Sequence, residues 1–186
     1  GSLRSSAVIA AVAAVLLSII GATARAAPQE VDTPRTALSV ASNDTHLFVS
    51  RRGKGLETCQ IDASQTVPVL VRMNLDGSGQ LPMIERCSAS IRSLAADTTH
   101  VYFIDSDGAL KRQPVTGGPI ELISVGVSGF IALDDDWVYW VEDRDPGLDM
   151  RVRRRAKVLG PVEALAEFEN VDVSLDFGGV AVDETH

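Results

Sequence analysis

The sequence predicts an all-β protein, a β-propeller of four-stranded antiparallel blades, present here as an incomplete N-terminal portion. Three observations predict it: a polar turn motif recurs along the chain, an arginine-bearing segment follows the motif, and the copies are regularly spaced. A repeat of roughly 40 residues that contains four short strands is the sequence signature of a propeller blade. We therefore expect about three blades and the start of a fourth.

Each unit begins with a turn motif between two apolar segments. The copies are SVASNDTHLFVS (39–50), SLAADTTHVYFID (93–105), FIALDDDWVYWVE (130–142) and GVAVDETH (179–186). Apolar alternation before an Asp or Asn, with an aromatic or β-branched run after it, predicts strand–turn–strand. The Asp or Asn suits the turn because its side chain accepts backbone N–H bonds. The predicted repeat turn positions are Asn43, His46, Asp97, His100, Asp134, Trp137, Asp183 and His186.

The second half of each unit is an arginine-bearing strand, a tight turn and a further apolar strand. We align the three copies on Arg72, Arg112 and Arg153. Asp76-Gly77 and Gly117-Gly118 are typical hairpin dipeptides, since glycine supplies the positive φ of a tight connection. The predicted boundaries are a signal peptide (1–26), a short linker (27–36) and a partial propeller (37–186), with blades at about 37–88, 91–125, 128–169 and 175–186.

All three histidines follow a threonine, at His46, His100 and His186. A metal site is one interpretation, but blade symmetry spreads equivalent turns around an axis, whereas metal ligands must converge on one ion. The third copy carries Trp137 at the same position. A position shared by His and Trp favours aromatic packing or capping at the start of a strand, so we expect no metal site there.

The N-terminus predicts a cleaved secretory signal peptide. Arg4 precedes an apolar run from Ala7 to Ile20, and Gly21 leads into Ala-x-Ala sequences that end at Ala26. This order of basic start, apolar run and small-residue cleavage site is typical of a signal peptide. The run of 14 residues is shorter than the roughly 20 that span a membrane. We expect a secreted or periplasmic protein with no stable membrane span after cleavage; an uncleaved N-terminal anchor is the alternative.

The charge balance argues against a nucleic-acid partner. Residues 1–26 contain two arginines and no acidic residue, so without them 17 basic and 25 acidic residues become 15 and 25, a net charge of −10. Phosphate binding requires a positive field. The basic stretch RVRRR (151–155) is then better explained as a strand whose arginines pair with carboxylates on neighbouring strands.

Cys59 and Cys87 are the two cysteines of the chain. In an exported protein an isolated pair predicts a disulfide, which would stabilise the fold by roughly 3–4 kcal/mol. Cys59 lies in an insertion between the second and third predicted strands of the first unit, and Cys87 follows its fourth strand. The bond would pin the insertion to its own blade; metal binding by two thiols is the alternative.

The motifs DDDWVYWVE (134–142), DTTHVYFIDSDG (97–108) and RMNLDG (72–77) resemble YWTD-type repeats of low-density-lipoprotein-receptor propellers, and more closely the related propellers of exported bacterial proteins. The resemblance covers about 37–186. Glu142 stands where the family has Asp, Phe103 where it has Trp, and HLFVSRR lacks the acidic residue. The resemblance implies binding of proteins or carbohydrates. It also implies about six blades, and hence a longer protein; closure by a second copy is the structural alternative.

Two acidic stretches are candidates for chemistry. Asp105 and Asp107 in DSDG could begin a calcium loop, although Asp-Gly is equally a hairpin turn and no closing Glu follows. Seven carboxylates between Asp134 and Asp149 could include a glycosidase pair, but cross-strand pairing with RVRRR explains them. We assign no catalytic residue and no cofactor, with calcium at Asp105 and Asp107 as the option.

The function that we expect is a non-catalytic exported binding or scaffold module for a protein, peptide or glycan. Its ligand would bind at loops on one face or at the mouth of the channel. The alternative is a propeller enzyme, a hydrolase or lyase, whose catalytic residues lie beyond residue 186.

Overall fold

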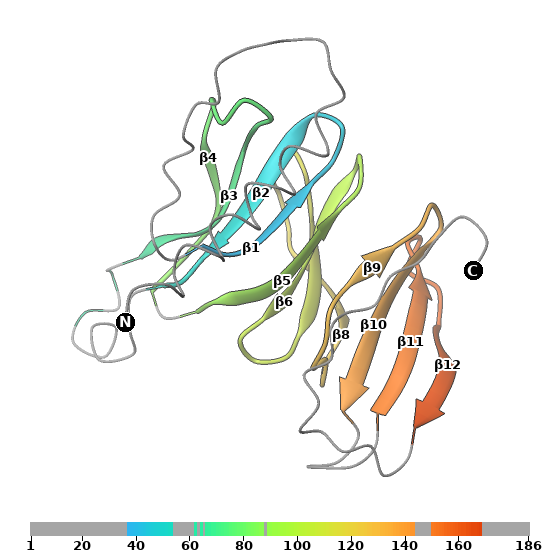
Figure 1. Ribbon diagram of the computed structural model, residues 1–186. Helices are drawn as coiled ribbons and strands as arrows, with labels where there is room; N and C mark the ends of the chain where they lie inside the picture. The colour runs from blue at the N-terminus through green and yellow to red at the C-terminus, as the bar shows by residue number, and fades with distance from the viewer. Residues whose placement is uncertain are drawn as a thin grey trace, which may run out of the picture. The chain divides into compact units, whose positions relative to one another are not determined.

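The computed structural model describes residues 37–53, 62, 64, 66–87, 89–143 and 150–168. Their regular structure consists of β-strands that form three four-stranded antiparallel sheets (Figure 1). The predicted all-β class and its four-stranded antiparallel units are therefore confirmed. In this part of the chain no helix is long and apolar enough to cross a membrane.

Each sheet contains four strands that are consecutive in the chain, hydrogen-bonded in chain order. The first sheet contains β1 (Ala37–Ser42), β2 (His46–Arg51), β3 (Val67–Asn74) and β4 (Leu81–Arg86). The second contains β5 (Ile91–Ala96), β6 (His100–Asp105), β7 (Leu110–Pro114) and β8 (Glu121–Ser124). The third contains β9 (Ala132–Leu133), β10 (Trp137–Asp143), β11 (Met150–Ala156) and β12 (Val162–Phe168).

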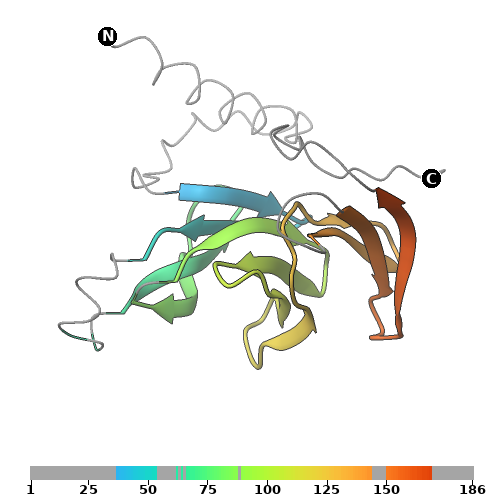
Figure 2. The same cartoon turned by 90° about the horizontal axis from the view of Figure 1, so that it is seen from below.

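The second sheet lies between the other two (Figures 1 and 2). Successive side chains of a strand point to opposite faces, so β6 contributes to both contacts. Phe103 packs in a cluster with residues of the first sheet, and Tyr102 in a cluster with residues of the third. This double burial explains why VYFI is continuously apolar rather than alternating.

Strand pairing corrects the predicted alignment of the arginines. Arg72 lies opposite Phe48, and Arg112 lies opposite Tyr102. These two aromatic residues lie five positions after the Asn or Asp of their turns. In the third sheet the residue opposite Tyr139 is Arg154. The alignment on Arg153 is therefore wrong by one residue, because a run of three arginines matches the pattern in more than one register.

The hairpins between third and fourth strands share one turn geometry. Gly77 and Gly117 have φ values of 84° and 88°, and each N–H donates to the carbonyl three residues before it. Leu159 occupies this position in the third sheet with φ 62°. A leucine is strained there, and its packing against the cluster between the second and third sheets offsets the strain. The sequence therefore lacked the glycine that marks the other two turns.

Several predictions fall outside the described residues, namely those on 1–36, Cys59, Asp183 and His186. Cys87 is described and directly follows β4. Gly53, where the insertion begins, donates its N–H to Ala89 at 3.2 Å. A Cβ on Gly53 would lie 2.5 Å from the Cys87 carbonyl oxygen. Gly53 therefore lies beside Cys87. Cys59 follows Gly53 by six residues, and a chain of this length is long enough to bring the two cysteines together.

We expect Cys59→Ser and Cys87→Ser each to lower the free energy of unfolding by about 3 kcal/mol, and the double variant to lower it no further. Thiol labelling of the unfolded, unreduced protein together with urea unfolding tests this. Two labelled thiols in the wild-type protein, or additive effects of the two substitutions, would exclude the disulfide.

Candidate functional site

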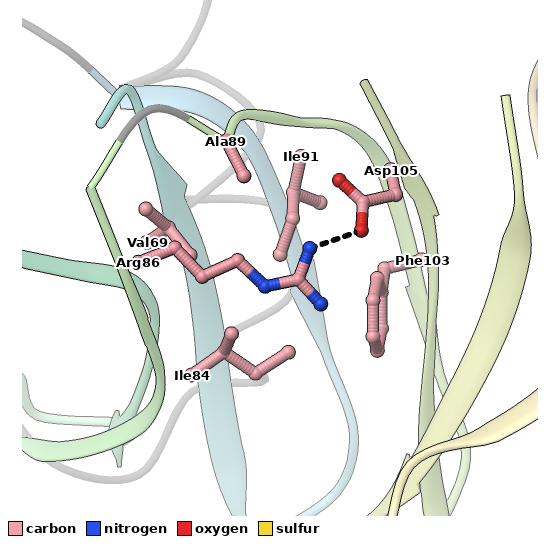
Figure 3. A pocket seen from close by; sticks show the side chains of 7 residues that line it. All are labelled: Val69, Ile84, Arg86, Ala89, Ile91, Phe103 and Asp105. Carbon is pink, nitrogen blue, oxygen red and sulfur yellow. Dashed lines mark hydrogen bonds and ion pairs between the residues drawn. The ribbon is translucent and has the colours of Figure 1, made fainter. Parts of the chain in front are cut away.

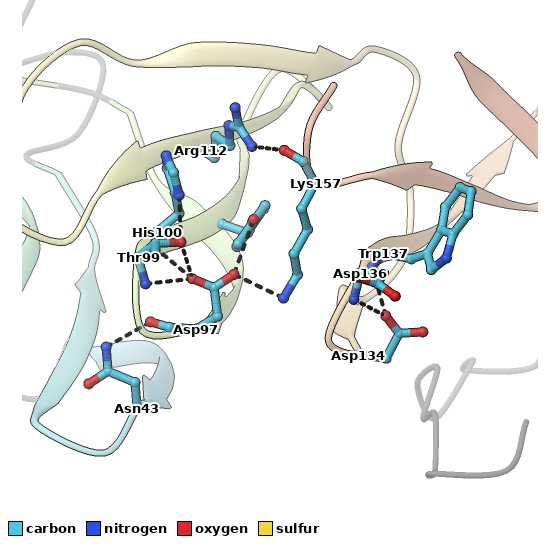
Figure 4. Close-up of polar contacts among 10 residues, drawn as sticks. Asn43, Asp97, Thr99, His100, Arg112, Asp134, Asp136, Trp137 and Lys157 are labelled. Atoms are coloured by element: carbon cyan, nitrogen blue, oxygen red, sulfur yellow. Dashed lines mark hydrogen bonds and ion pairs between the residues drawn. The ribbon is translucent and has the colours of Figure 1, made fainter. Parts of the chain in front are cut away.

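The turns between first and second strands lie at one end of their sheets and carry the predicted repeat positions. We call this end the turn face and define it by residues 43–45, 97–99 and 134–136, together with Lys157 (Figure 4). Lys157 belongs because its backbone N–H donates to Asp136 at 2.8 Å and its ammonium reaches Asp97.

The first residue of each turn is Asp or Asn, and one oxygen of its side chain accepts the hydrogen bonds that hold the turn. Asp97 Oδ1 accepts the N–H of Thr99 at 2.7 Å, the N–H of His100 at 2.8 Å and the Thr99 hydroxyl at 2.8 Å. The Asp97 N–H donates to the His100 carbonyl at 3.0 Å. Asn43 makes the same three side-chain bonds, and Asp134 accepts the two backbone N–H groups of its turn. Only a side chain with an oxygen at this distance from the backbone can do this.

The histidine position packs a ring beside the aromatic residue two places later. The His46 and Phe48 ring centroids are 6.3 Å apart, and those of His100 and Tyr102 are 6.2 Å apart. Each preceding threonine hydroxyl lies within hydrogen-bond distance of Nδ1, at 2.7 Å and 2.9 Å. Burial, followed by the nearby Arg112, lowers the pKa of His100, which favours the neutral ring.

Trp137 takes this position in the third sheet, with the Arg154 guanidinium 4.0 Å from its ring centroid. Among the described residues no three His, Cys, Asp or Glu side chains gather as a metal site would require.

Asp97 joins the three sheets. Asn43 Nδ2 donates to the Asp97 carbonyl at 2.7 Å, from the first sheet to the second. Lys157, from the third sheet, places Nζ 2.9 Å from Asp97 Oδ2, which also accepts the Tyr102 hydroxyl at 3.2 Å. Burial alone would raise the pKa of Asp97, but the His100 N–H, Lys157 and Thr99 hold it well below its usual range. Burial and the Asp97 charge raise the pKa of Tyr102 to about 12.

The arginines of the third strands form a second link between sheets, which the sequence interpretation missed. Arg72 Nη1 donates to the Val115 carbonyl of the second sheet at 2.5 Å, and Arg112 Nη1 donates to the Lys157 carbonyl of the third. The recurrence of arginine in each unit was the available signal. Its role was not apparent, because the acceptors are backbone carbonyls.

The tips of the turns are exposed, in contrast to their bonded bases. In each turn the second and third residues are exposed to solvent, and half of these six side chains are acidic. In the described part of the chain, the side chain of the second residue of each turn makes no hydrogen bond. The tip residues are Asp44, Thr45, Thr98, Thr99, Asp135 and Asp136.

A shallow hollow lies between the first and second sheets (Figure 3). It has essentially no room for a water molecule, whereas typical small-molecule sites enclose about 300–1,000 Å³. Its polar part is an ion cluster, in which Asp105 Oδ2 lies 2.6 Å from Arg86 Nη1 and 2.9 Å from Lys111 Nζ. Lys111 Nζ also lies 3.5 Å from Asp107. A calcium ion on Asp105 and Asp107 would have to displace these cations, so the contacts favour the hairpin interpretation.

The basic strand β11 is paired with carboxylates on its neighbours. Arg153 Nε lies 3.1 Å from Glu142 on β10, and Arg154 Nη2 lies 2.8 Å from Glu163 on β12. Arg151 Nε lies 3.0 Å from Glu167. These contacts are the cross-strand pairs that the sequence predicts, and they leave less positive charge for a phosphate ligand.

Comparison with known proteins leaves the family open. No family model matches the chain, and no curated protein matches it in sequence. Its structure is similar to the crystal structure of the N-terminal domain of Nup159, with 13% sequence identity and a TM-score of 0.48. The likeness covers 72% of this chain and 31% of that chain, so this chain spans about a third of the length of the protein it matches. A likeness of this extent supports no inference about function, which therefore depends on the geometry of the turn face.

Proposed function

We propose that the protein is an exported, non-catalytic β-propeller that acts as a binding or scaffold module for a protein, peptide or glycan, with the ligand bound on the turn face. The supporting observation is the contrast within each turn: the base is fixed by three or four hydrogen bonds, whereas the tip is exposed. Binding residues are typically found on loops that a rigid scaffold positions.

Three features support a propeller as the scaffold. The sheets share one strand order, they follow one another along the chain, and the second packs against both neighbours. The same repeat positions make the contacts in both interfaces, as Phe48 and Tyr102 illustrate. A radial series of such sheets protects the exposed edges that a single sheet would leave. The N-terminal sequence 1–26 supports export.

The chemistry of the tips favours a ligand with hydrogen-bond donors or positive charge. Asp44 and Asp135 are exposed acids at equivalent positions, and threonine takes the position in the turn between them. Surface carboxylates attract cationic side chains and accept hydroxyl hydrogen bonds of sugars. A basic protein segment or a glycan therefore suits the face better than an anionic ligand.

We expect Asp44→Lys/Asp135→Lys to weaken ligand binding at least tenfold while leaving the melting temperature within about 2 °C, since exposed substitutions change stability little. The full-length protein is first screened on glycan and peptide arrays, and the hits are measured by calorimetry. Glu85→Lys/Asp107→Lys is the matched control, because it makes the same charge change at exposed residues outside the turn face.

Equal losses in the tip and control variants would place binding elsewhere. A screen without hits, or turnover of an array compound, would remove the support for a non-catalytic binding module.

A further inference from the structure

Each sheet contacts the next one in the chain through the same repeat positions, and we call this side its outgoing face. In the second sheet it carries Tyr102, Leu110 and Ile123, which are 0%, 0% and 5% exposed beneath the third sheet. Ile123 stands at a β-bulge, since Lys111 pairs with Leu122 and Leu110 with Ser124. A bulge re-aims a side chain, here into the contact between sheets.

The third sheet repeats this outgoing face, but the face is exposed to solvent at the outer strand, β12. Tyr139 and Val152 repeat Tyr102 and Leu110 by their positions relative to the arginine. Leu165 repeats Ile123 and stands at the same bulge, since Val152 pairs with Ala166 and Arg153 with Ala164. Leu165 is 46% exposed, against 5% for Ile123. The third sheet thus presents an apolar position of the kind that the second sheet buries.

Arg154 gives a second, polar sign of an incomplete contact. Arg72 and Arg112 occupy its repeat position, and each donates Nη1 to a carbonyl of the following sheet. Arg154 pairs with Glu163 through Nε and Nη2 and stacks on Trp137. Within the described residues the structure gives its Nη1 no carbonyl acceptor, in contrast to Arg72 and Arg112.

The side that receives a preceding sheet also has a signature residue, three positions before the Asp or Asn of the turn. Leu94 and Ile131 take this position in the second and third sheets, and each is 8% exposed. Val40 takes it in the first sheet, where no described sheet precedes, and it is 42% exposed. The position is therefore buried by the preceding sheet, and in the sequence GVAVDETH it is Val180.

We propose that the outgoing face of the third sheet binds residues 179–186 of the same chain as the first strand and turn of a fourth repeat, with Val180 on Leu165 and Tyr139. Ile131, Ile123 and Tyr102 already form this arrangement one interface earlier. The sequence of 179–186 supports this occupant, since it repeats the apolar lead-in, the Asp and the Thr-His of the sheets that dock in this way. The inference rests on the propeller arrangement of the proposed function and is independent of any ligand.

The test is a double-mutant cycle in the full-length protein, with thermal unfolding and sedimentation velocity as readouts. We expect Leu165→Asp and Val180→Asp each to lower the melting temperature by about 5–10 °C, and the double variant to add little more, because residues in contact are not additive. Leu165→Ala and Val180→Ala repeat the cycle if the aspartates do not fold. Val158→Asp is the control, since Val158 is 90% exposed in the turn between β11 and β12 and should tolerate the charge.

A monomeric protein with non-additive losses supports the proposal. A concentration-dependent dimer that Leu165→Asp dissociates and Val180→Asp leaves intact would assign the face to a second copy and overturn it. Additive losses, or a Val180→Asp variant as stable as the Val158→Asp control, would also overturn it. None of these outcomes depends on ligand binding, so the turn-face proposal can fail separately.

Discussion

Replacement of Trp140 by alanine is expected to lower the free energy of unfolding by about 4 kcal/mol. Trp140 is completely buried in the cluster that joins the second and third sheets. Its Nε1 donates to Glu142 Oε1 at 3.0 Å, and Glu142 also accepts the Ser124 hydroxyl of the second sheet at 3.0 Å. The substitution therefore opens a cavity at the contact between sheets and removes one donor from a shared carboxylate.

Two control variants separate this effect from the loss of any tryptophan. Trp140→Phe should lower the free energy of unfolding by only about 1–2 kcal/mol, because Phe103 fills the equivalent position in the second sheet with no exposed surface. Trp137→Ala removes a ring that is only partly buried and should have a smaller effect than Trp140→Ala. Urea unfolding followed by circular dichroism measures all three variants. A Trp140→Ala effect no larger than that of Trp137→Ala would contradict the role assigned to this core.

Those parts of the fold that depend on contacts near in sequence could be predicted. The turn between β5 and β6 is specified by Asp97 and the three donors directly after it, so its sequence alone predicts it. The aromatic run after the turn was equally informative, because burial on both faces requires an apolar residue at each position of VYFI. Equal spacing of such segments then indicated a repeat.

The links that Asp97, Arg72 and Arg112 make between sheets could not be predicted, because they join residues more than forty positions apart and depend on register. The sequence does not show that Lys157 meets Asp97, since the same lysine could have faced solvent. The choice of Arg154 over Arg153 likewise depends on which arginine lies opposite Tyr139. The third hairpin was predicted from the repeat, but the sequence does not show that Leu159 takes the positive-φ position of Gly77 and Gly117, because tertiary packing there offsets the unfavourable backbone conformation.

Asp97→Ala is expected to destabilise the protein by about 3–4 kcal/mol, because it removes the oxygen that closes its turn and leaves Lys157 without its carboxylate. Lys157 Nζ and Asp97 Oδ2 lie 2.9 Å apart, with side chains only 17% and 19% exposed. Asp97→Asn is the matched variant, since Asn43 closes the first turn with the same bonds from its amide oxygen. It should destabilise by about 1–2 kcal/mol, and the difference between the two variants measures the turn alone.

The pH dependence of Asp97→Asn identifies the charge as the cause of its effect. The folded-state pKa of Asp97 is held below its usual range, so this carboxylate contributes stability above its unfolded pKa of about 3.9 and loses that contribution as the pH falls toward the folded value. The pKa values of Asp105 and Asp134 are lowered too, but both proteins contain these groups and their contributions cancel in the difference. Urea unfolding between about pH 2 and pH 7 should therefore show the wild-type protein and Asp97→Asn converging in stability below about pH 4. A difference that stays constant across this range would assign the loss to altered hydrogen-bond geometry in the turn, and the contact with Lys157 would then contribute no stability.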